Sequence, residues 1–220
     1  MRREFQTVTI ENIHSTHRAR KSEIDLRLAE FANIGLRGSD ERLFEELVFC
    51  IFTAGASARM GLRSIEAVRS LLHEGTHEEL IEALKKKHRY PRARSGYIVV
   101  TRDYLNENCG MRLRERLASF NDPVARRDWL ARERRIKGLG YKEASHYLRN
   151  IGLRGYAILD KHILRSLHEL EVIDSPLPPT TRRRYLEVEE SLRRFAERIN
   201  IDFDELDLIL WSMKTGEILK

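Results

Sequence analysis

The sequence is poor in the features that hold metal clusters or cross membranes. Cys50 and Cys109 are the only cysteines in its 220 residues. Two thiolates cannot supply the four that bind an iron–sulfur cluster or an all-cysteine zinc site, so we expect no metal and no cofactor. No apolar run approaches the roughly 20 residues that span a bilayer, and the first residues lack the apolar stretch of a secretory signal. We therefore expect a cytoplasmic protein without a membrane partner.

Proline and glycine are also scarce, with 5 and 12 residues, which excludes collagen-like and low-complexity chains. Hydrophobic residues make up 41% of the chain, enough to bury a core. The apolar spacing is helical nearly throughout, and only the short stretches TVTI and YAIL resemble strands. The sequence therefore predicts an all-α fold, with helices over 22–36, 42–52, 57–72, 77–87, from Pro91 onward, 123–136, 180–199 and 203–213.

The charge is unevenly distributed along the chain. Lys and Arg number 40 against 34 Asp and Glu, a net charge of +6. Residues 84–154 alone carry 19 basic and 7 acidic groups, a net charge of +12, and the remainder has a net charge of −6. Arginine outnumbers lysine 31 to 9, and its planar guanidinium suits phosphate recognition. A basic middle between acidic ends is typical both of a polyanion-binding face and of a solvated, salt-bridged helical surface.

The most informative stretch is residues 129–152, which read as a helix, the turn KGLG and a second helix. Gly138 and Gly140 allow a tight turn around Leu139, which we expect to plug between the helices, while Ala144 permits their close approach. The second helix begins at once, so its free amides and positive dipole end point out of the turn. Such a turn can bind a phosphate oxygen without any side chain. We favour phosphate binding over an ordinary helix corner with a glycine stop.

Two ionisable residues near the hairpin suggest chemistry. Lys142 stands in the first turn of the second helix, where the positive dipole end disfavours the ammonium form, and a neutral amine is a nucleophile that can form a Schiff base. A solvated lysine that adds to the basic surface is an equally good interpretation. Asp160 follows YAIL and precedes a helix, so it is either a plain N-cap or a carboxylate held across a cleft from Lys142. In the second role it would orient the nucleophile and stabilise positive charge developing on a sugar.

Several segments together resemble a known family. The hairpin KGLGYK, the helix EASHYLRN and the downstream ILDKHILR resemble the helix–hairpin–helix base-excision DNA glycosylases. With ELVFCIFTAGASA, HRYPRAR, RRRYLEVEE and the ending DLILWSMKTGEILK, the chain is most similar to the archaeal and bacterial type-2 8-oxoguanine DNA glycosylase/AP lyase family. The resemblance runs from about residue 40 to the C-terminus. The lack of a four-cysteine cluster separates the chain from the endonuclease III branch.

The resemblance implies two helical domains with an active-site cleft between them. One domain would comprise residues 1–40 and 158–220, and the other would be a central barrel of residues 41–157 that contains the helix–hairpin–helix at about 123–152. The damaged nucleotide would be flipped out of the duplex into this cleft. The expected partner is double-stranded DNA that contains oxidised guanine, bound by a monomer associated with the nucleoid.

The resemblance also assigns roles to individual residues. Lys142 would attack the sugar C1′ and expel the base, the resulting Schiff base would permit β-elimination of the 3′ phosphate, and Asp160 would assist the first step. His162 would contact a phosphate, although a first-turn helical position explains it equally well. The base pocket would include Trp211 and Lys220. The indole of Trp211 can stack on the purine, although a place in the helix core explains this residue equally well. Lys220 is otherwise a frayed, solvated chain end. The phosphate-binding hairpin would consist of Lys137, Gly138, Leu139 and Gly140.

The resemblance leaves the gap-filling residue and the lesion open. The loop TAGASA at 53–58 is made of small residues, whereas relatives are expected to carry a bulkier group near Ala56, which would enter the gap left by the flipped base. Pocket shape sets the choice of lesion, so a glycosylase for another base lesion is one alternative. A non-catalytic helix–hairpin–helix DNA-binding protein is the other, and such a protein would need no lysine at position 142.

Overall fold

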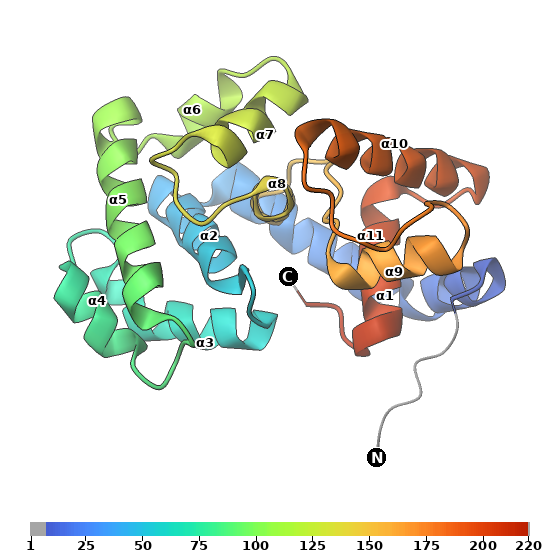
Figure 1. Ribbon diagram of the computed structural model, residues 1–220, viewed down its shortest axis with the longest axis horizontal. Coiled ribbons are helices and arrows are strands. Elements are labelled where there is room, and N and C mark those ends of the chain that lie inside the picture. Colours follow the sequence, from blue (N-terminus) through green and yellow to red (C-terminus); the bar gives the residue numbers. More distant parts are fainter. Residues whose placement is uncertain (1–7, 220) are drawn as a thin grey trace. The chain divides into compact units, whose positions relative to one another are not determined.

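The computed structural model describes residues 8–219, and within this range it contains α-helices, one short 3-10 helix and no strand (Figure 1). The prediction of an all-α fold is therefore confirmed. In chain order the helices are α1 (Ile10–Arg37), α2 (Asp40–Thr53), α3 (Ala58–Val68), the 3-10 helix η1 (Arg69–Leu71), α4 (His77–Leu84), α5 (Pro91–Cys109), α6 (Leu113–Ala118), α7 (Pro123–Arg132), α8 (Tyr141–Asn150), α9 (Lys161–Glu169), α10 (Arg182–Arg198) and α11 (Phe203–Thr215).

Helix α1 is much longer than the helix predicted at 22–36, because it begins at Ile10 and runs for 28 residues. The buried apolar side chains along α1 are Ile13, Ile24 and Phe31. They form a narrow stripe in which the first two lie 11 positions apart, so the first half of the helix has no clear apolar period. Periodicity therefore recognises only its second half.

Two short helices before the hairpin also differ from the prediction. Helix α6, with buried Leu113 and Leu117 four positions apart, was not expected. Helix α7 ends at Arg132 rather than near residue 136, because Glu133 leaves the helical backbone with a ψ of 118°. The residues from Glu133 to Gly140 therefore form an irregular connection between α7 and α8.

The described chain divides into two compact units, one formed by Phe31–Gly152 and the other by the residues up to Glu30 together with those from Leu153 onward. The domain boundaries expected from the sequence, after residues 40 and 157, lie farther along the chain. The first boundary of the structure therefore falls inside α1, whose last turns belong to the unit that contains the hairpin.

Helix α2 forms the core of the unit Phe31–Gly152. All its side chains from Leu43 to Thr53 are buried, because α2 packs against α3, α5, α6 and α8 (Figure 1). The helix starts at Ser39, whose hydroxyl accepts the Arg42 amide at 3.3 Å. Burying each large apolar side chain of α2 contributes roughly 1.5–3 kcal/mol, so this helix is a rigid base for the neighbouring α8.

The other unit is built on α9, α10 and α11. Helix α11 packs against both α9 and α10. Lys214 of α11 forms an ion pair with Glu169 of α9 at 2.7 Å, and Arg154 reaches Asp204 at the start of α11 at 2.8 Å. No helix in the described part of the chain is long and apolar enough to cross a membrane.

Candidate functional site

The turn between α7 and α8 has the geometry that its glycines predict. Gly138 has a φ of +80°, which favours glycine, and a Cβ at this position would lie 2.7 Å from Cδ2 of Tyr97. Leu139 is buried at 7% exposure and Ala144 at 0%. Leu139 therefore plugs the hairpin, and the buried Ala144 has only a methyl side chain, too small to hold the two helices apart, as expected from the sequence.

The hairpin packs against α5, and α5 is joined in turn to the α2–α3 loop. The Lys137 amide donates to Oγ1 of Thr101 at 2.9 Å. The guanidinium of Arg94 lies 5.4 Å from the centre of the Tyr97 ring and donates to the carbonyl of Ala54. Burial lowers the pKa of Arg94, but an arginine in a protein keeps its proton, so the guanidinium remains positively charged. Sequence reasoning missed Arg94 and Tyr97, which lie in and just after the segment HRYPRAR.

The hairpin amides are not equally available to a ligand. The Gly140 amide donates to Oε2 of Glu143 at 3.2 Å, the spacing of one half of a capping box. The amides of Gly138, Leu139 and Lys142 make no hydrogen bond within residues 8–219. These three amides, rather than that of Gly140, are therefore free to bind an anion at the start of α8.

Lys142 lies in the first turn of α8, as expected, with about a quarter of its side chain exposed (26%). Its Nζ is 3.7 Å from Oε1 of Glu143. Glu143 thus contacts both the turn and the lysine, and sequence reasoning did not single it out. The signal was present, because Glu143 stands three positions after Gly140, where a capping-box glutamate stands.

Asp160 caps the N-terminus of α9. Its Oδ1 accepts the amides of His162 at 2.7 Å and Ile163 at 2.9 Å, so the N-cap interpretation is confirmed. Its Oδ2 makes no hydrogen bond with the described residues. One oxygen is therefore used to start the helix, and the other is available for a second role.

His162 is half-buried in the first turn of α9. Burial lowers its pKa, and nearby cations, Lys161, Arg165 and Lys214, lower it further, while Asp160 opposes them. The DNA-free protein therefore disfavours protonation of the His162 imidazole.

The two residues expected in a base pocket have different outcomes. Trp211 lies on α11 and is half-buried, between the buried Leu210 and Ser212. Its ring is therefore neither fully inside the core nor fully exposed. Lys220 lies outside the described residues.

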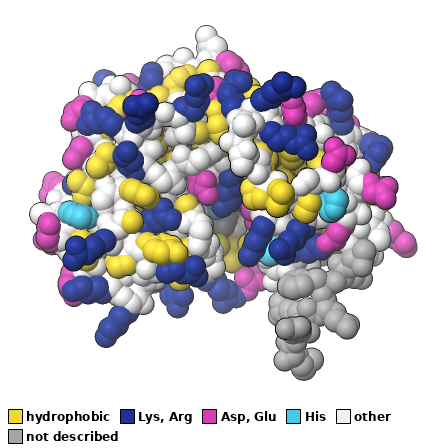
Figure 2. All heavy atoms as spheres, viewed as in Figure 1, with side chains coloured by type: hydrophobic (Ala, Val, Ile, Leu, Met, Phe, Trp, Pro, Cys, Tyr) yellow, Lys and Arg dark blue, Asp and Glu magenta, His cyan; other side chains and the backbone are white. Residues whose placement is uncertain are grey.

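The site residues fall into two groups. Lys137, Gly138, Leu139, Gly140 and Lys142 come together in one hairpin of the unit Phe31–Gly152, whereas Asp160, His162 and Trp211 belong to the other unit. The basic side chains are not confined to the hairpin, because Figure 2 shows Lys and Arg at many points of the visible face, with Asp and Glu between them.

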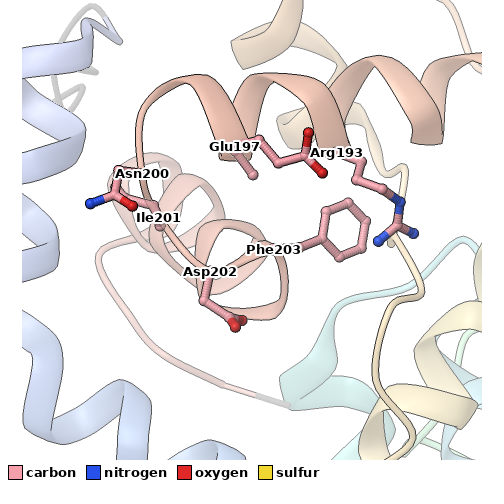
Figure 3. Close-up of a pocket in the computed structure, with 7 residues that line it drawn as sticks. Arg193, Glu197, Asn200, Ile201, Asp202 and Phe203 are labelled. Atoms are coloured by element: carbon pink, nitrogen blue, oxygen red, sulfur yellow. The ribbon is translucent and has the colours of Figure 1, made fainter.

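A pocket of about 340 Å³ lies elsewhere, between the end of α10 and the start of α11. Figure 3 shows the guanidinium of Arg193 beside the ring of Phe203 there, 4.3 Å from the ring centre. None of the site residues predicted from the sequence lines it. No cluster of three or more His, Cys, Asp or Glu side chains that could hold a metal occurs among the residues described.

An all-α chain in which a glycine hairpin, plugged by a buried leucine, leads into a helix with free N-terminal amides has the form of the helix–hairpin–helix class of proteins. The family model described as 8-oxoguanine DNA glycosylase matches residues 24–201. The chain belongs to this family, and the resemblance recognised in its motifs is confirmed.

Named relatives match over nearly the full chain. The 8-oxoguanine DNA glycosylase/AP lyase of Methanocaldococcus jannaschii is 41% identical over 91% of this chain and 93% of its own length. The protein of the same name from Korarchaeum cryptofilum is 41% identical over 90% of each chain.

Solved structures agree with these relatives. The crystal structure of the 8-oxoguanine DNA glycosylase of Thermotoga maritima matches with a TM-score of 0.86 and 36% identity, covering 96% of this chain and 98% of that one. The Methanocaldococcus jannaschii 8-oxoguanine glycosylase/lyase, in complex with a 15-mer DNA that contains 8-oxoguanine, matches with a TM-score of 0.87 and 39% identity, covering 96% and 99% of the two chains.

Proposed function

We propose that this protein is a bifunctional DNA repair enzyme that excises 8-oxoguanine from double-stranded DNA and then cleaves the strand at the abasic site. Lys142 carries this proposal, because a DNA-binding hairpin needs no lysine in the first turn of α8, whereas a lyase needs an amine there. The relatives named 8-oxoguanine DNA glycosylase/AP lyase and the related complex with 8-oxoguanine DNA support the same substrate and reaction.

In the proposed reaction, Lys142 supplies the nucleophile. Its neutral amine attacks C1′ of the damaged nucleotide, the N-glycosidic bond breaks, and the bonding electrons leave with the base, which takes up a proton. Opening of the sugar ring gives a Schiff base between Lys142 and C1′. Loss of a C2′ proton then expels the 3′ phosphate by β-elimination, and water releases the lysine.

Asp160 is proposed to act electrostatically in the first step. As the base departs, positive charge develops on the sugar, and a fixed carboxylate stabilises that charge more than it stabilises the neutral substrate. The Oδ1 atom remains on the α9 amides, so the free Oδ2 is the oxygen proposed to face the sugar.

The hairpin and His162 are proposed to hold phosphates. The free amides of Gly138, Leu139 and Lys142 suit one phosphate oxygen at the positive end of α8, with Lys137 adding charge. His162 would donate one hydrogen bond to another phosphate. These contacts fix the register of the DNA without reading its sequence, and Trp211 and Lys220 are proposed to line the base pocket.

Strand cleavage on defined duplexes tests the proposal. The wild-type protein should nick a duplex with one 8-oxoguanine and leave the undamaged duplex intact, and Lys142→Gln should abolish the nicking. Lys85→Gln is the matched control, because Lys85 pairs with Glu82 at the exposed end of α4. Loss of nicking in both variants, or in neither, would contradict the assignment of Lys142 as the nucleophile.

A panel of lesions separates the two alternatives. Faster release of another damaged base than of 8-oxoguanine would establish the alternative substrate. Binding of every duplex without release of any base would establish a non-catalytic DNA-binding protein.

We further propose that the protein acts as a monomer in the cytoplasm, associated with the nucleoid. The molar mass of the free protein in solution tests the monomer and should equal that of one chain at every concentration. With a short duplex, the mass should rise by that of one duplex per chain. A mass that doubles with concentration would contradict it.

A further inference from the structure

The segment 155–159, which leads into Asp160, is buried from Tyr156 onward and belongs to no helix or strand. Tyr156, Ala157, Ile158 and Leu159 are each at most 7% exposed. Buried backbone amides and carbonyls must find hydrogen-bond partners, and no neighbouring strand supplies them within the described chain. Most of the partners come instead from side chains of α10, and Asp204 at the start of α11 accepts the Gly155 amide at 2.9 Å.

Three polar side chains, spaced four residues apart on α10, bind this backbone. The Tyr185 hydroxyl donates to the Ala157 carbonyl at 2.6 Å and accepts the Leu159 amide at 3.4 Å. The Glu189 carboxylate accepts the Ala157 amide at 2.9 Å. Arg193 donates to the Gly155 carbonyl at 3.0 Å. We call Tyr185, Glu189 and Arg193 the α10 ladder.

The ladder holds the segment up to the residue before Asp160. The Asp160 amide donates to the Ile158 carbonyl at 2.8 Å, so the chain turns immediately after the last ladder contact. Tyr185 and Glu189 are themselves buried, at 3% and 7% exposure. Burying a hydroxyl and a carboxylate is costly unless each is hydrogen-bonded, and their bonds to this short stretch of backbone offset part of that cost.

We propose that the α10 ladder positions Asp160 for the proposed glycosylase reaction, with Tyr185 the most important because it binds closest to Asp160. This inference rests on the proposed function. With Oδ1 fixed on the α9 amides, the direction of Oδ2 depends on the backbone that enters α9. A small displacement of a reacting group can cost about a hundredfold in rate. The ladder residues act through Asp160 and touch no DNA in this account.

Tyr185→Phe is the direct test, because it removes only the hydroxyl. Base release from 8-oxoguanine duplex in a single turnover should slow about tenfold, while the affinity for the duplex changes less than about twofold. Tyr147→Phe is the matched control. Tyr147 is fully buried on α8, but its hydroxyl has no hydrogen-bond partner among residues 8–219, so its loss should leave the rate unchanged.

A double-mutant cycle separates positioning from general damage. If Tyr185 acts through Asp160, Tyr185→Phe should slow base release in the wild type and cause no further slowing in Asp160→Asn. Equal slowing in both backgrounds, or an unchanged rate in the wild type, would overturn the proposal. Wild-type protein that releases no base would instead contradict the proposed function, and the positioning role would fall with it.

The other two ladder residues give an independent test if Tyr185→Phe does not fold. Glu189→Gln keeps an oxygen that can accept the Ala157 amide and should retain most of the rate, whereas Glu189→Met removes the acceptor and should slow base release. Arg193→Ala, farthest from Asp160, should have the smallest effect, with the exposed Arg194→Ala as its control. Equal rates for the Gln and Met variants, or the largest loss at Arg193, would overturn the proposal.

Discussion

The hairpin before Lys142 and the segment before Asp160 are both irregular stretches that lead into a helix, but they are held in different ways. The shape of the hairpin is set by nearby residues, namely the positive φ of Gly138, the buried Leu139 and the contact between Gly140 and Glu143, while Thr101 and Tyr97 of α5 support it from outside. The segment 155–159 is fixed mainly by side chains of α10, together with Asp204 at the start of α11, all of them far away in the sequence. Two residues proposed to work together thus depend on local and on long-range order, respectively.

The largest effect is expected at Asp160, where helix capping and the proposed electrostatic role can be separated. Asn is as good an N-cap as Asp, so Asp160→Asn should melt within a few degrees of the wild type. Removing the charge should slow single-turnover base release by about 100-fold or more, with little change in DNA affinity. Asp122→Asn, at the N-cap of α7, is the control. A parallel loss of melting temperature and rate would make Asp160 purely structural.

Gly138→Ala tests whether the hairpin depends on its own backbone. The variant combines a positive φ with a Cβ only 2.7 Å from the Tyr97 ring, so it should lose about 2 kcal/mol or more of stability and bind DNA more weakly. Gly55→Ala is the matched control, because Gly55 has a φ of +73° but nothing within 4 Å of its Cβ position.

Gly55→Ala should therefore lose only about 1 kcal/mol. Thermal melting measures both variants, at roughly 2–4 °C per kcal/mol for a chain of this size. Equal losses at the two glycines would show that the contact with Tyr97 does not constrain the hairpin.

Comparison of these regions also explains what could be predicted from the sequence. The plug Leu139, the small Ala144 and the N-cap at Asp160 follow from neighbouring residues, and the structure agrees with each. Glu143 was overlooked although its spacing from Gly140 indicates a cap. Tyr185 and Glu189 could not be predicted, because their partners lie on a distant segment with no pairing pattern. The early start of α1 was missed for a related reason, since its buried residues are too sparse to show a period.

A smaller effect is expected at Glu143, where charge opposes DNA binding. Glu143→Gln keeps an oxygen that can accept the Gly140 amide but removes a negative charge beside the proposed phosphate site. The affinity for undamaged duplex should rise by about two- to fivefold at low salt, the scale of a partly exposed charge interaction, and the gain should shrink as salt increases. Glu82→Gln on α4 is the control. Weaker DNA binding by Glu143→Gln would contradict this prediction. It would show that the negative charge of Glu143 is needed to hold the turn in its DNA-binding form.

The smallest effect is a pH dependence in the unit that holds the hairpin. Burial lowers the pKa of His88 below its ordinary value of 6.5, with Arg94 and Arg89 adding to the shift and the bond to the Phe52 carbonyl opposing it. Its Nδ1 accepts the Tyr90 amide at 3.0 Å, a bond that protonation would break.

The unfolded chain therefore takes up this proton first as the pH falls below 6.5, so the free energy of unfolding should be constant above about pH 7.5 and decrease below 6.5. The variant His88→Gln should have a lower melting temperature than the wild type at pH 7.5. Between pH 7.5 and 5.5 its melting temperature should fall less than that of the wild type, and the two falls should differ by about a degree or two. An unchanged pH slope would exclude His88 as its source.

Trapping of the covalent intermediate tests the central claim most directly. Borohydride added during reaction with an 8-oxoguanine duplex reduces a Schiff base to a stable amine, and peptide mass analysis identifies the attached residue. The account predicts one adduct, on the peptide that contains Lys142, and none in Lys142→Gln. An adduct on another lysine or on the N-terminal amine, or an undiminished adduct in Lys142→Gln, would contradict the assignment of the hairpin lysine as the nucleophile.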